Sequence, residues 1–131
     1  MKTLANCTPA EFLRQTNRMR KRVGSLLKDS KVGEIRKRKP ALTGEETEEQ
    51  KKALYRKQAE DNISAMLDLL LENYAERTAE VLGMMCFIEP EDINNHQALD
   101  FLSPAVEVLN DQSVVDFLSS LMKSEILNTG G

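Results

Sequence analysis

The chain has 131 residues, of which 40% are hydrophobic and 30% are charged, and its net charge is −3 at pH 7. This composition is typical of one soluble globular domain, and the scarcity of aromatic residues predicts an aliphatic, methionine-rich core. We expect neither a membrane span nor secretion, because no segment approaches the roughly eighteen apolar residues of a span and the first residues lack the apolar core of a signal peptide. Cys7 and Cys86 are isolated, which predicts two free thiols in a reducing cytoplasm, with no metal and no cofactor.

The small net charge hides an uneven distribution along the sequence. Residues 1–40 carry twelve Lys and Arg against three acids, whereas residues 58–131 carry two basic residues against fourteen acids. We therefore expect a basic N-terminal helix and linker, residues 1–42, and an acidic helical body, residues 43–131, within one domain overall. A chain with this polarity can bind a polyanion, associate head to tail with another copy, or pair with itself.

The first predicted helix has a clear beginning and end. Thr8-Pro9-Ala10-Glu11 is a capping box with proline at the first helical position. A narrow apolar stripe follows at three- and four-residue intervals, and most of the remaining circumference is basic. We expect this helix to end at Asp29-Ser30. Beyond it, the stretch 32–40 predicts one or two helical turns at most and then a basic linker, because Pro40 disfavours a helical conformation of Lys39.

The rest of the chain also has helical periodicity. Thr43-Gly44-Glu45-Glu46 is a second capping box, from which we expect a helix of about thirty residues with a break near Asn73. Its apolar face widens in the second half, which predicts burial on more than one side. The apolar run 83–88 is expected to pass through the core, and further helices are expected before and after Asp111. The sequence therefore predicts an all-α fold, a single compact bundle of about five or six helices with a basic N-terminal helical arm.

The sequence offers little for catalysis. His96 is the only histidine, and Asp92 and Asp100 lie one helical turn to either side of it. These three residues lack a fourth ligand or a nucleophile with which to form a metal or catalytic site. We expect His96 to be an exposed polar residue, and we do not expect an enzyme.

Two clusters of basic residues are candidates for binding a polyanion. They are Arg18, Arg20, Lys21 and Arg22 in the first helix, and Arg36, Lys37, Arg38 and Lys39 in the linker. Such side chains can contact phosphates, but no aromatic residue lies among them for base stacking and no helix-turn-helix pattern follows. The alternative is a solvated basic face that pairs with the acidic part of the same chain or of a neighbour.

The last predicted helix has a broader apolar face than a terminal helix of a small domain usually buries. Core packing is the ordinary explanation of such a face, and a groove for a partner protein is the alternative. On the second interpretation the partner-binding residues are Leu118, Leu121, Met122 and Ile126.

The order of these features resembles a known family. A capped basic helix comes first, then the acidic segment NYAERTAEVLGMMCFIEPED and the closing segment VVDFLSSLMKS. This order resembles the small tail assembly chaperones of tailed phages and prophages, and the similarity covers residues 60–127. The resemblance implies a cytoplasmic protein of the bacterial host that binds an elongated tape-measure protein and recruits tail-tube subunits. The basic first forty residues have no counterpart that we can align.

The residues and the resemblance together predict a non-enzymatic helical protein that binds other proteins and associates with itself. Apolar faces of the acidic body would shield amphipathic helices of a long client. The competing hypothesis is a small helical regulator that binds nucleic acid through the basic N-terminal arm.

Overall fold

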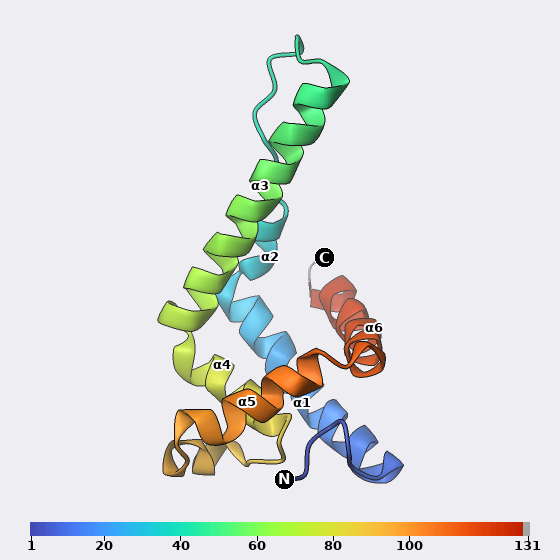
Figure 1. Cartoon of the computed structure of the whole chain (residues 1–131), viewed down its shortest axis with the longest axis vertical. Helices are drawn as coiled ribbons and strands as arrows, with labels where there is room; N and C mark the ends of the chain where they lie inside the picture. Colours follow the sequence, from blue (N-terminus) through green and yellow to red (C-terminus); the bar gives the residue numbers. More distant parts are fainter. Residues whose placement is uncertain (130–131) are drawn as a thin grey trace. The chain divides into compact units, whose positions relative to one another are not determined.

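The computed structural model describes the backbone of residues 1–129, with the side chains of residues 1–121 and of Lys123. The fold is all-α, as predicted, and no strand occurs in residues 1–129 (Figure 1). The elements in chain order are α1 (Pro9–Ser30), α2 (Val32–Arg36), α3 (Glu48–Asp68), the π-helical turn η1 (Leu69–Asn73), α4 (Ala75–Met84), the 3₁₀ helix η2 (Pro90–Asn95), α5 (Ala98–Leu109) and α6 (Gln112–Thr129). None of the described helices has the length and apolar character needed to span a bilayer.

Residue contacts group the chain into two compact units. The first unit joins Met1–Leu26 to the chain from Glu76 onward, and the second is Leu27–Ala75. This grouping differs from the expected division at residues 42 and 43. Most of the basic helix α1 packs with the acidic second half of the sequence, while the basic linker packs with α3.

Helix α1 has the limits that the sequence predicts. The backbone N–H of Thr8 donates to the carboxylate of Glu11 at 3.0 Å, and the N–H of Glu11 donates to the Thr8 hydroxyl at 3.2 Å. These two bonds satisfy donors that the first turn of a helix cannot pair internally. The helix runs without interruption to Ser30 and ends where Lys31 takes a left-handed conformation with φ 57°.

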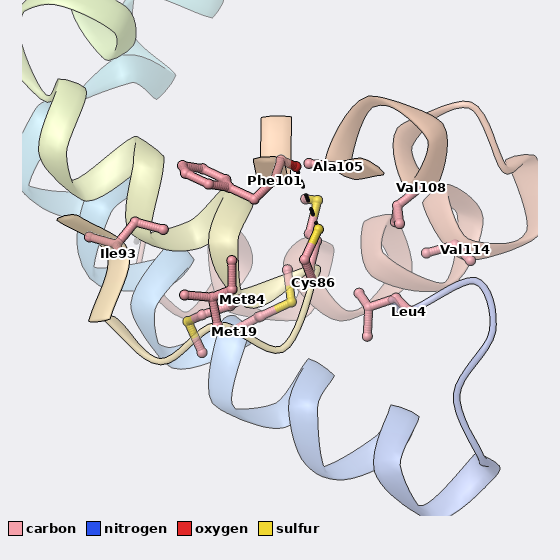
Figure 2. Packing of buried hydrophobic residues seen from close by; sticks show 11 residues of the cluster. Leu4, Met19, Met84, Cys86, Ile93, Phe101, Ala105, Val108 and Val114 are labelled. Atoms are coloured by element: carbon pink, nitrogen blue, oxygen red, sulfur yellow. Dashed lines mark hydrogen bonds between the residues drawn. The ribbon is translucent and has the colours of Figure 1, made fainter. Parts of the chain in front are cut away.

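The core of the first unit is aliphatic and rich in methionine, as predicted. Figure 2 shows its buried side chains, which come from the segment before α1, from α1, α4, α5 and α6, and from the segment between α4 and α5. Met19, Met84 and Val108 are at most 2% exposed. The apolar run 83–88 does pass through this core, and a turn with Phe87 at φ 58° follows α4. The N–H of Leu4 and the amide of Gln15 donate to the carbonyls of Met85 and Met84, so that the end of α4 is not left unpaired.

Helix α3 begins about one turn later than the sequence predicts. Only half of the Thr43 box forms: Glu46 accepts from the backbone N–H groups of Thr43 and Gly44, but the Thr43 hydroxyl accepts from the N–H of Glu45. However, Gly44 has φ +91°, a conformation that is incompatible with a right-handed helix. A second box four residues on, in which Thr47 and Gln50 bond reciprocally, is the true N-terminus of α3. The Thr43 box instead shapes the loop before it.

The expected burial of the widening apolar face is wrong. Ile63, Leu67 and Leu71 are 54%, 50% and 55% exposed. The helical break is real, but it lies at Tyr74, after the π-helical turn and one residue beyond the predicted position. The second half of α3 and η1 therefore carry apolar side chains that the described residues of the chain leave uncovered.

Candidate binding surfaces

Of the four residues predicted to bind a partner on the last helix, the structure describes the side chains of two, Leu118 and Leu121. Leu118 is partly buried and packs against the core of the first unit, and Leu121 is also partly buried. Phe117, beside Leu118, lies 5.2 Å from Phe12 of α1 between ring centroids, in a tilted arrangement. The side chains of Met122 and Ile126 lie outside the described residues. The described part of this face thus contributes to the internal packing of α6.

Two members of the first basic cluster, Arg18 and Arg22, pair with carboxylates of their own unit. The guanidinium of Arg18 donates to both carboxylate oxygens of Glu89, and the bond from its Nη1 is 3.0 Å long. Nη1 of Arg22 lies 2.8 Å from the Glu80 carboxylate. The Arg18 guanidinium lowers the pKa of Glu89 below its ordinary value. Arg20 donates to the side chain of Asn17. Both carboxylates come from the acidic half of the chain, so Arg18 and Arg22 pair with the acidic part of the same molecule.

A shallow polar hollow of about 320 Å³ adjoins this cluster. Lys21, Arg22, Ser25 and Arg77 line it together with Glu80 and Val81. Arg77 donates to the Ser25 hydroxyl at 3.0 Å. The carboxylate of Glu80 lies among the cations and offsets part of their charge, which reduces the attraction that this hollow can exert on a phosphate.

The second basic cluster lies in the other compact unit. The side chains of Arg36, Lys37, Arg38 and Lys39 are exposed, and none of them makes an ion pair in the described part of the chain. In Figure 1 the segment after α2 runs along α3 before the chain turns back into it. Buried Asn62 of α3 fixes this segment, because its amide donates to the backbone carbonyls of Arg36 and Arg38 at 3.5 and 3.0 Å.

A groove of about 410 Å³ lies between this segment and α3. We call it the α3 groove; its lining consists of Arg36, Arg38, Pro40, Tyr55, Gln58, Ala59, Asn62, Ile63 and Met66. No acidic side chain is among them. The floor is apolar, and two of its residues, Tyr55 and Ile63, are about half exposed. An apolar floor beside unpaired guanidinium groups is suited to an amphipathic partner that carries negative charge.

Helix α5 carries a second uncovered apolar surface, in the first compact unit. We call it the α5 ridge; it consists of Leu99, Val106 and Leu109, which are 77%, 54% and 45% exposed. The face of α5 with Phe101, Ala105 and Val108 is buried in the core (Figure 2). The ridge is flanked by acids, because Asp100 and Glu107 are seven residues apart and therefore lie on one side of the helix.

The residues considered for chemistry do not form a reactive cluster. His96 is exposed, as expected, and the described residues contain no group of histidine, cysteine or carboxylate side chains able to hold a metal ion. Cys7 and Cys86 are free thiols. Burial raises the pKa of both, and Cys86 donates to the carbonyl of Phe101 at 3.5 Å, so neither thiol is activated as a nucleophile.

Comparison of the chain with models of known protein families, with curated proteins and with solved structures finds no match. The α3 groove and the α5 ridge are therefore identified as candidate binding surfaces from their geometry alone. Sequence reasoning did not select the α5 ridge or the floor of the α3 groove. A signal for the ridge was present, because α5 has apolar residues around most of its circumference and one element of a small domain cannot bury all of them.

Proposed function

We propose that this protein is a non-enzymatic phage or prophage tail assembly chaperone that works in the cytoplasm of the bacterial host. It would bind an elongated helical client, such as a tape-measure protein, and tail-tube subunits. The observation that carries the proposal is the α5 ridge, a row of three exposed apolar side chains on a helix whose other face is fixed in the core. The resemblance of residues 60–127 to this family directs the choice of client.

The ridge has the form of a docking surface for a helix. Leu99, Val106 and Leu109 follow one another at seven- and three-residue intervals, which places them along one side of α5. Covering an exposed Leu or Val side chain completely is worth about 1.5–3 kcal/mol, so three partly exposed ones can supply a few kcal/mol. Because the buried face of α5 holds the helix in place, binding of a client costs little conformational entropy of α5.

The charges beside the ridge indicate which client segments it favours. Asp100 and Glu107 flank it, and no Lys or Arg occurs between Arg77 and Lys123. These acids repel a nucleic-acid backbone and favour an apolar client segment with neutral or basic flanks. The ridge therefore supports a protein-binding role over the alternative of a nucleic-acid-binding regulator.

Co-expression with the tape-measure protein of the same phage genome tests the proposal. We expect the wild-type chain to keep this client in the soluble fraction, and L99D/V106D to lose that effect while retaining its helical circular dichroism spectrum. A matched control is N94D/N95D, which adds the same charge at two exposed positions of η2 outside the ridge. A client whose solubility is the same with and without the wild-type chain would overturn the proposal.

A further inference from the structure

We propose that the α3 groove is a second docking site, and that its occupant is an acidic amphipathic helix of a partner protein. The groove lies in the unit Leu27–Ala75, whereas the α5 ridge lies in the other unit. The charges beside the two surfaces are opposite in sign. The inference goes beyond the proposed function, since it assigns a separate site to a partner of different chemistry.

The basic wall of the groove is fixed before any partner arrives. Asn62 is only 5% exposed, and it holds the backbone of Arg36 and Arg38 against α3 through its two amide hydrogen bonds. Gln58 in turn donates to the Asn62 carbonyl oxygen at 2.8 Å, which sets the orientation of the Asn62 amide. A wall that is already ordered costs a ligand less conformational entropy on binding than a free linker would.

The floor of the groove matches the repeat of a helix. Tyr55, Ala59, Ile63 and Met66 are spaced by four, four and three residues, so they form one stripe along α3. The stripe covers about 17 Å at a rise of about 1.5 Å per residue. This length accommodates about three turns of a partner helix, whose own apolar side chains at positions i, i+4 and i+7 would rest on it. Pro40, in the same segment as Arg36 and Arg38, adds an apolar residue to the lining.

The charge of the wall determines the sign of the partner. Arg36 and Arg38 line the groove without an ion pair among the described residues, and Lys37 and Lys39 lie between and beside them. Guanidinium groups bind carboxylates through two parallel hydrogen bonds, which gives Glu and Asp side chains of a partner both affinity and register. A nucleic acid would satisfy the same cations but would leave the mostly aliphatic floor uncovered. The combined surface therefore favours an acidic amphipathic helix.

The test uses the full-length protein and two designed peptides, and fluorescence anisotropy measures the binding of each peptide. Both peptides are helical 15-residue sequences with leucine at i, i+4, i+7 and i+11; one has glutamate at the flanking positions and the other has lysine. Because the α5 ridge favours basic flanks, the two peptides are compared on the ridge variant L99D/V106D. There we expect the glutamate peptide to bind at least tenfold more tightly than the lysine peptide, with a difference that shrinks as salt rises. Equal binding of the two peptides to this variant, or a preference for lysine, would overturn the proposal.

Variants then locate the binding. R36E/R38E should bind the glutamate peptide at least tenfold more weakly and the lysine peptide more tightly. I63D should bind both peptides more weakly. The matched control K28E/K57E reverses two exposed cations of the same unit that do not line the groove, and should bind the glutamate peptide like the wild type. Loss of binding in the control equal to that in R36E/R38E would show a general charge effect and overturn the site.

A nucleic acid or a second copy of this chain could occupy the groove instead, and a separate measurement detects each; either result would overturn the proposal. A 20-nucleotide single-stranded RNA that displaces the glutamate peptide at a lower concentration than unlabelled peptide would assign the groove to nucleic acid. Self-association of the wild-type chain that R36E/R38E abolishes in analytical ultracentrifugation would assign it to a second copy. The ridge variant L99D/V106D should bind the glutamate peptide normally, so that failure of the groove and failure of the proposed client site are distinguishable.

Discussion

Gly83 is the residue whose side-chain size the core restricts most directly. A Cβ at this position would collide with Cδ1 of Ile93 and lie 3.7 Å from Cβ of Ile88. The Cδ1 methyl of Ile93 must then turn away within the packed core, and the preference of a helix for alanine over glycine offsets part of that cost, so we expect G83A to destabilise the protein by up to about 2 kcal/mol. Gly33 is a matched control, since nothing lies within 4 Å of its Cβ position, and G33A should be neutral or stabilising by up to about 1 kcal/mol. Urea unfolding of both variants measures the difference; equal stabilities would show that Ile93 can move without cost.

Two leucines test the shift of the candidate site from α6 to α5. Leu118 packs against the core, whereas Leu99 is 77% exposed. We expect L118D to be strongly destabilising, by about 3 kcal/mol or more, because a carboxylate would replace a packed side chain. L99D should change the free energy of unfolding by no more than about 0.5 kcal/mol. Thermal unfolding followed by circular dichroism checks both, and a stable L118D would return Leu118 to the set of partner-binding candidates.

At the scale of the element, the two consecutive capping boxes should respond differently to mutation. Thr47 accepts from the Gln50 N–H at the start of α3, so T47A should expose that amide and cost about 1 kcal/mol. Thr43 bonds to Glu46 within the preceding loop, so T43A should leave the Gln50 amide protected. Hydrogen exchange at Gln50 measures this difference directly. Faster exchange of Gln50 in T43A than in T47A would place the start of α3 at the first box after all.

The same elements mark what the sequence can and cannot predict. The limits of α1 follow from Thr8, Pro9 and Ser30, because capping depends on neighbours in the chain. The start of α3 does not, since two Thr boxes four residues apart have equal local merit and only the left-handed Gly44 separates them. Periodicity placed Ile63 on an apolar face but could not show that nothing in the described chain covers it. Burial depends on which elements meet, and that is a property of the tertiary structure.

At the scale of the whole molecule, the charge polarity of the sequence is partly neutralised on folding. Arg18 and Arg22 of α1 pair with Glu89 and Glu80, although the two partners are 71 and 58 residues apart. A list of charges along a chain cannot show which of them will meet. The polarity that suggested nucleic-acid binding is therefore in part the polarity of internal ion pairs.

These ion pairs make a prediction about nucleic acid. We expect the wild-type chain to bind a 20-base-pair DNA duplex weakly even at low salt, because Glu80 and Glu89 offset the cations of α1. Removing both charges in E80Q/E89Q should raise the affinity several-fold and make it more dependent on salt. Fluorescence anisotropy at two salt concentrations measures both effects. Tight, salt-sensitive binding by the wild type that E80Q/E89Q does not change would instead support the regulator hypothesis.

Below about pH 5, the free energy of unfolding should depend on the carboxylate of Glu11 in α1 and on that of Glu89, the partner of Arg18. The ion pair with Lys2, assisted by hydrogen bonds from Thr8, lowers the pKa of Glu11 to about 2 from an ordinary value of 4.5, and Arg18 lowers the pKa of Glu89. A carboxylate with a lower pKa in the folded chain than in the unfolded chain stabilises the fold above its unfolded pKa. That contribution is lost as pH falls through the folded value. We therefore expect the free energy of unfolding to decrease from about pH 5 to pH 2, at low ionic strength.

Glutamine at position 11 isolates this effect. Its side chain can still accept the hydrogen bond of the Thr8 N–H, so E11Q keeps the capping box and loses only the charge. At pH 7 the variant should be slightly less stable than the wild type, because the pair with Lys2 is exposed and screened by solvent. Between pH 5 and pH 2 its stability should fall less steeply, and the two proteins should converge near pH 2. Urea unfolding at each pH measures the two slopes; parallel curves would mean that the Lys2–Glu11 pair does not persist in solution and that the acid dependence comes from other carboxylates.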